Sequence, residues 1–164
     1  MSNAPIDRAA AHAMWEAYRA ANPQQATDAE DPPADTFGDH PELTEALIAL
    51  VLDGTKRATA TLVAEFEAEG QPLPRIGGQW VACDSTGAPR AVLRSTELRV
   101  GPMTSVDAAF AYDEGEDDRT LESWRENHAH YWRRRVPHIG IEWSDDLEVV
   151  FERFSVVWPP DVRD

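Results

Sequence analysis

The sequence has little cysteine, little lysine and no long apolar run. Its 164 residues include one cysteine, Cys83, which cannot close an intrachain disulfide, and no Cys/His group has zinc-site spacing. No apolar run approaches the roughly 18 residues that a membrane span needs, and the N-terminus lacks the basic-then-apolar pattern of an export signal. We therefore expect a cytoplasmic protein with no membrane partner.

Acidic residues outnumber basic residues two to one. The chain carries 30 Asp and Glu against 15 Lys and Arg, so its formal net charge is −15. Such an excess usually opposes nucleic-acid binding, which depends on Lys and Arg. The excess is uneven, because residues 1–55 carry −8, residues 56–110 carry zero and residues 111–164 carry −7. The neutral middle third can therefore bind an anion. It contains Lys56, which is the single lysine of a chain that has fourteen arginines.

Hydrophobic periodicity predicts helices in the first half of the chain and most strands in the second. A proline-containing acidic stretch over residues 23–38 is typical of a linker or loop. A helix capped by Asp39 should end at Gly54, where a left-handed residue is usual. The other expected helices cover residues 7–22, 61–69, 104–112 and 119–135, and the expected strands cover residues 79–84, 89–100 and 146–158. This order predicts an α+β fold built around a small barrel.

The short pattern Gly54-Thr55-Lys56-Arg57-Ala58-Thr59 is the strongest candidate for a chemical site. If one more helical turn follows Gly54, Lys56 and Thr59 point the same way, so an ammonium and a hydroxyl face one pocket. The charge of Arg57 would favour an anionic ligand and make Lys56 easier to deprotonate. The pattern is short, and a solvated loop after a helix end is the alternative.

Four segments together resemble the ASCH domain, a small β-barrel family related to PUA RNA-binding domains. They are FGDHPELTEALIALVLDGTKRATATL, EFEAEGQPLPRIGGQW, FAYDEGEDDRTLESWRENH and VFERFSVVW, and they occur in the family's order from Phe37 to about Trp158. The resemblance implies a PUA-like domain over residues 37–164, preceded by an N-terminal helix and acidic linker over residues 1–36.

The resemblance also implies two activities. Some ASCH proteins are ribonucleases that act on single-stranded RNA, and others are amidohydrolases that remove the acetyl group of N4-acetylcytidine with a Lys, a Thr and a Glu. The Lys and Thr match Lys56 and Thr59. The Glu is assigned to Glu114, with Glu116 as the alternate. Family members often carry an Arg where this chain has Thr61, which makes Thr61 a candidate substrate contact.

The two activities require opposite charge states of Lys56. In amide hydrolysis, a neutral Lys56 takes the proton of Thr59, the alkoxide attacks the acetyl carbonyl, and Glu114 serves as acid and base. In RNA cleavage the 2′-hydroxyl is the nucleophile, a charged Lys56 stabilises the phosphorane oxygens, and Glu114 accepts the proton. A pH–rate profile can therefore separate them.

For the other candidate site residues, an ordinary structural role in the core or on the surface is the alternative. Trp80 follows a Gly-Gly pair and could stack a base, although core packing is the commoner role of tryptophan. His128 and His130 are two apart on a helix and point away from each other, so core or surface roles are favoured over metal binding. The acidic stretch 113–118 could hold a divalent cation but lacks calcium-loop spacing. The basic run 133–135 is interpreted as a salt-bridged surface. The remaining candidate substrate contacts are Arg57, Arg75, Arg94, Arg99 and Glu116.

The sequence thus predicts a protein that binds single-stranded RNA or a modified nucleoside around Lys56, Thr59 and Glu114. Cleavage of RNA is the first expectation, deacetylation of N4-acetylcytidine is the second, and RNA binding without turnover is the third. No cofactor is expected, although the acidic stretch leaves a divalent cation possible. The oligomeric state stays open.

Overall fold

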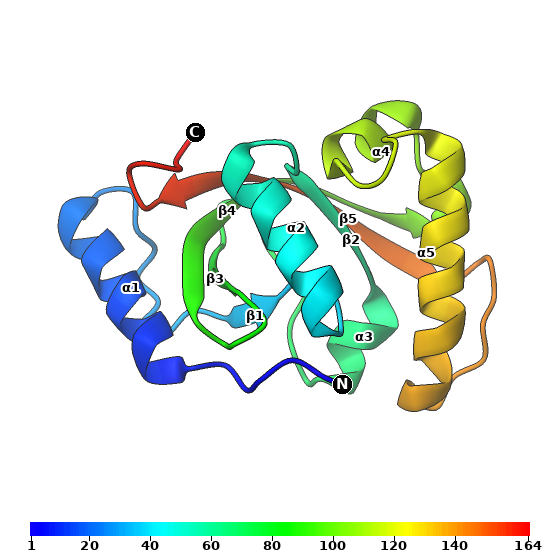
Figure 1. Cartoon of the computed structure of the whole chain (residues 1–164), viewed down its shortest axis with the longest axis horizontal. Helices are drawn as coiled ribbons and strands as arrows, with labels where there is room; N and C mark the ends of the chain where they lie inside the picture. The colour runs from blue at the N-terminus through cyan, green and yellow to red at the C-terminus, as the bar shows by residue number, and fades with distance from the viewer. The chain divides into compact units, whose positions relative to one another are not determined.

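The computed structural model describes all 164 residues and divides them into two compact units. Unit 1 contains residues 1–55, 76–96 and 154–164, and unit 2 contains residues 56–75 and 97–153. Five α-helices and five strands confirm the predicted α+β class (Figure 1). No helix is long and apolar enough to cross a membrane.

Unit 1 contains the N-terminal helix and the short parallel strand pair. Helix α1 packs on β3, and β1 pairs in parallel with β3. Because Trp15 and Tyr18 lie three apart on α1, they share one helix face and are buried with Val81 of β3. The bounds are α1 Arg8–Ala21, β1 Ala34–Thr36, α2 Pro41–Asp53 and β3 Gln79–Cys83.

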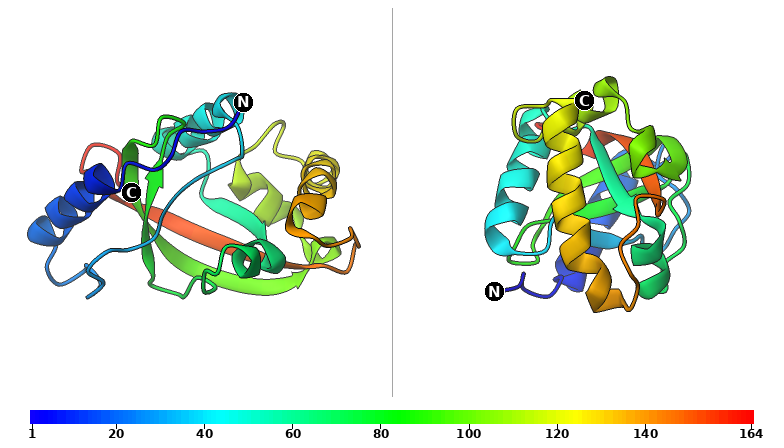
Figure 2. Two further views of the ribbon diagram at one scale, coloured as in Figure 1. Left: turned by 90° about the horizontal axis from the view of Figure 1, so that it is seen from below. Right: turned by 90° about the vertical axis from the view of Figure 1, so that its right-hand side faces the viewer.

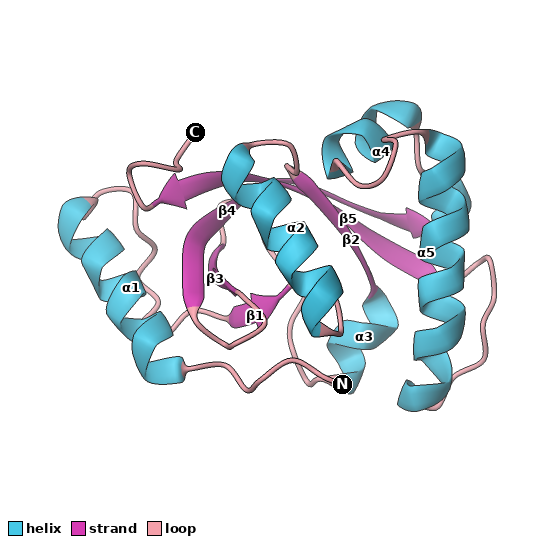
Figure 3. Cartoon of the chain, in the orientation of Figure 1, coloured by secondary structure: helices cyan, strands magenta, loops and turns pink.

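Unit 2 contains five helical segments, three α-helices and two short 3₁₀ helices. Strand β2 runs directly into α3, as the colouring by secondary structure shows (Figure 3). Helix α4 packs against both β2 and α5, and α5 faces the viewer in the right-hand view of Figure 2. The bounds are β2 Ala58–Leu62, α3 Val63–Ala68, η1 Met103–Ser105, α4 Ala108–Glu114, α5 Leu121–Arg135 and η2 Val136–Ile139.

The strands form one sheet in the order β1-β3-β4-β5-β2. Its two long strands, β4 (Pro89–Pro102) and β5 (Glu148–Trp158), contribute residues to both units. In unit 2, β2 is antiparallel to β5, with Ala58 opposite Arg153 and Leu62 opposite Val149. Ala58, Leu62 and Val149 are buried in the apolar core under α4 and α5. Because strand side chains alternate, this register also fixes which face of β2 each neighbouring residue occupies.

Two predicted helix boundaries are wrong for identifiable reasons. Asp39 does not cap α2: His40 occupies the N-cap position, and an Asp39 carboxylate oxygen lies 2.9 Å from the His40 ring instead. The turn after Gly54 and the start of the predicted 61–69 helix form strand β2, because pairing with β5 buries Ala58 and Leu62. Gly54 does end α2 in a left-handed conformation, as predicted.

Two further segments differ from the prediction. The predicted 104–112 helix is divided into η1 and α4, so Glu114 is the last residue of a helix and not part of a loop. The stretch 23–38, expected to be a linker, contains β1, whose three residues are too few to show a strand pattern.

The cap of α4 supports the helix that carries Glu114. The Asp107 carboxylate accepts a hydrogen bond from the Phe110 N–H at 2.8 Å. We expect Asp107→Ala to lower the free energy of unfolding by about 1 kcal/mol, because it leaves a helix N–H without its partner. Urea unfolding measures the change, and Asp145→Ala, which removes an exposed carboxylate from the loop before β5, is the control. An equal effect of both substitutions would contradict the capping role.

Candidate functional site: a buried charge cluster

Lys56 lies two residues before β2, in a segment that a backbone hydrogen bond joins to helix α4. The N–H of the next residue, Arg57, donates to the Asp113 carbonyl oxygen at 2.8 Å. This hydrogen bond joins the segment before β2 to the last turn of α4, which ends in Glu114. The Lys56 side chain is only 1% exposed. Such burial is rare for a lysine unless its ammonium is paired.

Two carboxylates surround the Lys56 ammonium. Its Nζ lies 2.9 Å from Glu116 Oε2 and 3.5 Å from Glu114 Oε1, and it also contacts the Glu114 carbonyl oxygen at 3.4 Å. Glu114 is 2% exposed, whereas Glu116 is 23% exposed. The ammonium is therefore enclosed, and Glu116 is the carboxylate that solvent and ligands can reach.

Helix α5 supplies two more partners for Glu114. The Trp124 indole N–H donates to Glu114 Oε2, and His128 Nε2 lies 3.0 Å from Glu114 Oε1. Trp124 and His128 are four residues apart, so they lie on the same face of α5, which packs on α4. We call Lys56, Glu114, Glu116 and His128 the buried charge cluster.

The environment of Lys56 keeps it protonated. Burial by itself lowers the pKa of an ammonium, but the charges of Glu116 and Glu114 outweigh burial and raise the pKa of Lys56 above its ordinary value. The pKa of Glu116 is also raised, because burial and the nearby Glu114 charge outweigh the attraction of Lys56. A carboxyl with a raised pKa close to an ammonium is suited to accept and return a proton.

Glu114 and His128 are shifted in opposite directions. Burial disfavours the charged form of each, but their mutual attraction prevails, so the pKa of Glu114 is lowered and the pKa of His128 is raised. These shifts favour the charged forms of Lys56, His128 and Glu114 and the protonated form of Glu116. The net charge of the cluster is zero or +1, depending on Glu116, in a chain of net charge −15.

The loop that carries Glu116 is fixed by its own contacts. Asp117 and Arg119 adopt left-handed conformations with φ of 50° and 63°, which are uncommon for residues other than glycine. The Arg119 guanidinium lies 3.6 Å from the centre of the exposed Tyr112 ring and donates to the Tyr112 carbonyl oxygen at 2.8 Å. Because the Arg119 N–H also donates to the Glu116 carbonyl oxygen, this stack holds Glu116 beside Lys56.

The cluster also has the donor set of a metal site. Glu114, Glu116 and His128 offer ligand atoms that lie within 4.8 Å of one another. The Lys56 ammonium already lies against both carboxylates and supplies a positive charge at this point. A divalent cation would have to compete with it, so the arrangement fits an ion-pair cluster better than a cation site.

Thr59 lies in strand β2 and not in the helical turn that the sequence predicted for it. Ala58 and Leu62 face the apolar core, so Thr59 and Thr61 lie on the opposite face of β2 by alternation, and Thr59 is paired with Glu152. Both threonines are half-buried. The predicted helical turn that would align Lys56 with Thr59 does not form.

The other predicted contacts lie in different places. Arg57 is half-buried in unit 2, where its guanidinium donates to the Lys56 carbonyl oxygen at 2.8 Å, and Arg75 is exposed on a loop of the same unit. Trp80 and Arg94 belong to unit 1. There the Trp80 ring packs on Phe37, with ring centres 5.3 Å apart, and Arg94 is exposed.

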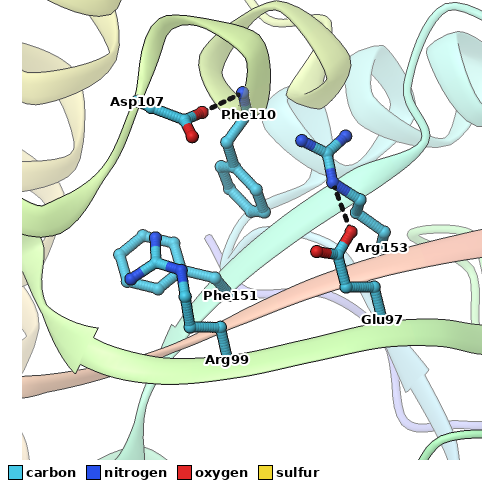
Figure 4. Close-up of a pocket in the computed structure, with 6 residues that line it drawn as sticks. All are labelled: Glu97, Arg99, Asp107, Phe110, Phe151 and Arg153. Carbon is cyan, nitrogen blue, oxygen red and sulfur yellow. Dashed lines mark hydrogen bonds and ion pairs between the residues drawn. The ribbon is translucent and has the colours of Figure 1, made fainter.

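A small cavity of about 50 Å³ lies beside the start of helix α4 in unit 2 (Figure 4). The Arg99 guanidinium lies 4.2 Å from the centre of the Phe151 ring, and Arg153 pairs with Glu97 at 2.9 Å and with Asp113. Because two carboxylates already bind Arg153, this cavity has little excess positive charge. The lining residues are Glu97, Arg99, Asp107, Phe110, Phe151 and Arg153.

His128 and Trp124 are the site residues that the sequence interpretation missed. His128 was assigned a core or surface role, because it was compared only with His130, which is exposed. The useful signal was the spacing of four between Trp124 and His128, combined with the acidic residues that precede their helix. In the basic run 133–135, Arg135 Nε lies 3.5 Å from a Glu65 carboxylate oxygen, whereas Arg133 and Arg134 lie over the rings of Trp143 and Tyr131.

The protein is an α+β protein with one five-stranded sheet, and a buried cluster of acidic and basic side chains lies at the end of helix α4. Comparison with known families then identifies it: the ASCH domain family matches residues 33–158, so the chain belongs to that family and has its PUA-like fold. This confirms the resemblance found in the sequence. No curated protein matches the chain.

Two solved structures are similar over nearly the whole chain. An ASCH domain from Lactobacillus crispatus JV V101 is 26% identical, with a TM-score of 0.82 over 92% of this chain and 96% of that one. Protein EF3133 from Enterococcus faecalis V583 is 27% identical, with a TM-score of 0.81 over 90% of this chain and 88% of that one.

Proposed function

We propose that this ASCH domain protein binds single-stranded RNA and cleaves it at the Lys56–Glu116 pair. The observation that carries the proposal is the buried Lys56 ammonium, 2.9 Å from a partly exposed carboxylate. RNA cleavage requires a charged lysine, and two carboxylates favour that state here. Removal of the Thr59 proton by a neutral lysine would work against the same two charges.

Glu116 is the better proton acceptor of the two glutamates. Glu114 accepts hydrogen bonds from Trp124 and His128 and lies 3.5 Å from Lys56 Nζ. The charges of His128 and Lys56 outweigh burial and lower the pKa of Glu114, so it is a weak base. Glu116 is 23% exposed, and its pKa is raised. We therefore transfer the acid–base role from Glu114 to Glu116.

The proposed reaction uses these two groups in sequence. Glu116 accepts the 2′-hydroxyl proton while the 2′-oxygen attacks phosphorus, and the Lys56 ammonium stabilises the charge on the phosphorane oxygens. The P–O5′ bond breaks, and Glu116 returns the proton to the leaving 5′-oxygen. The products are a 2′,3′-cyclic phosphate and a 5′-hydroxyl.

Hydrolysis of N4-acetylcytidine is the second candidate, and the enclosure of Lys56 favours it. An ammonium 1% exposed admits a small neutral group more easily than a polyanion. In this version Glu116 activates a water molecule and Lys56 stabilises the amide oxyanion. The threonine nucleophile predicted from the sequence is tested by Thr59→Val, which should abolish acetate release only if Thr59 attacks the carbonyl.

One experiment separates the candidates. The wild-type protein and Lys56→Ala are incubated with labelled single-stranded RNA and, in parallel, with N4-acetylcytidine. We expect the wild type to produce RNA fragments with cyclic phosphate ends and the variant to lose this activity. Acetate release without RNA cleavage would support the second candidate. RNA binding without either reaction would overturn both and leave a non-catalytic RNA-binding regulator.

A further inference from the structure

The hydrogen bonds of His128 determine its protonation state. Its Nδ1 lies 2.8 Å from the Trp124 carbonyl oxygen, which can only accept, and its Nε2 lies 3.0 Å from Glu114 Oε1. A neutral imidazole carries one N–H and cannot donate to both. Either the ring carries two protons or Glu114 carries one.

The surroundings of Glu114 select the first alternative. Its other oxygen accepts from the Trp124 indole N–H, and Lys56 Nζ lies 3.5 Å from Oε1. Donors on both oxygens favour the carboxylate over the protonated acid. Glu114 is therefore ionised, and His128 is an imidazolium with both ring nitrogens donating.

The His128 ring is packed as a fixed part of helix α5. It stacks on Trp124 with ring centres 4.0 Å apart and planes 16° apart, and Trp132 lies 5.2 Å away. The side chain is 12% exposed, so it has little contact with solvent. The titratable groups near it are Glu114 of α4, Glu116 of the following loop and Lys56 before β2.

We propose that His128 is a positioning residue for the Lys56–Glu116 pair. Its imidazolium neutralises Glu114, so Lys56 does not have to balance that carboxylate alone. The Lys56 ammonium accordingly lies closer to Glu116, at 2.9 Å, than to the Glu114 carboxylate, at 3.5 Å. The role in turnover rests on the proposed function, whereas the charge of His128 can be measured without it.

NMR of ¹⁵N-histidine-labelled protein tests the charge directly. The His128 signals are assigned by their loss in His128→Gln, and the exposed His130 and His138 are internal references. We expect both His128 ring nitrogens to stay protonated as the pH is raised past 6.5, the ordinary pKa of histidine. A His128 that loses a ring proton at or below pH 6.5 would overturn the proposal, whatever the activity assays show.

Kinetics test the positioning role. A positive charge at His128 lowers the pKa of Glu116, so His128→Gln should move the Glu116 limb of the pH–rate profile to higher pH and reduce RNA cleavage about 10- to 100-fold. His130→Gln on the same helix should change neither. A uniform loss of rate with an unshifted profile would mean a purely structural role and overturn the proposal. Histidine signals as predicted, with no cleavage by the wild type, would refute the proposed function alone.

Discussion

Replacing Lys56 with methionine is expected to lower the free energy of unfolding by about 3–5 kcal/mol at neutral pH, because it leaves the buried Glu114 and the partly exposed Glu116 without their ammonium. Methionine has a similar volume to lysine, so the substitution creates no large cavity. The loss of unfolding free energy therefore measures the effect of removing the charge. The cost should become smaller as the pH falls, since Glu116, whose pKa is raised above its ordinary value of 4.5, then becomes protonated more readily. Urea unfolding at pH 5 and pH 7.5 measures both values.

A matched charge change provides the control for this prediction. Arg75→Met also removes one positive charge from unit 2, but Arg75 is exposed on a loop, so its effect should stay within about 0.5 kcal/mol. Equal effects of the two substitutions would show that Lys56 matters only through net charge. A cost for Lys56→Met that grows as the pH falls would contradict the pairing with Glu116.

The two glutamates should separate stability from activity. Glu114→Gln leaves the buried charges of His128 and Lys56 without their shared partner, and we expect it to cost about 3–5 kcal/mol. Glu116→Gln should cost about 1 kcal/mol, because Glu116 is 23% exposed, yet lower RNA cleavage by about 10²- to 10⁴-fold. Unfolding curves and single-turnover cleavage of the same preparations compare the two.

The pH dependence of the Glu114→Gln cost has a definite direction. The lowered pKa of Glu114 gives stability that is present above its ordinary value of 4.5 and lost as the pH falls through the lowered value. The raised pKa of His128 gives stability that is present below 6.5 and lost as the pH rises through the raised value. The cost should thus be greatest between about pH 4.5 and 6.5. A cost that keeps rising above this window would contradict an imidazolium at His128.

Local sequence signals were sufficient for the presence of most helices, although not for all of their boundaries. Gly54 marks the end of α2, and the lysine that follows in the same short pattern, Lys56, is the ammonium of the buried charge cluster. The strand Ala58–Leu62 could not be recognised in the same way. Its five residues are strand only because β5, about 90 residues later in the sequence, pairs with them and buries alternate side chains.

The choice between Glu114 and Glu116 also depended on contacts that are distant in the sequence. Both glutamates lie in one acidic stretch, and nothing local distinguishes their pKa values. The difference arises because Trp124 and His128 of α5 bind Glu114 and leave Glu116 partly exposed. Charge counting by thirds pointed to the neutral middle third, whereas both carboxylates that pair with Lys56 come from the last third.

The charge of Lys56 is the central claim, and the sequence makes it unusually easy to measure. Because Lys56 is the only lysine, ¹³C-lysine labelling gives one side-chain Cε signal for the whole chain. We predict that this signal keeps the position of a protonated lysine from pH 5 to pH 10, since the pKa of Lys56 is raised by Glu116 and Glu114 against the effect of burial. A titration of that signal near neutral pH would contradict the account and restore Lys56 as a neutral base.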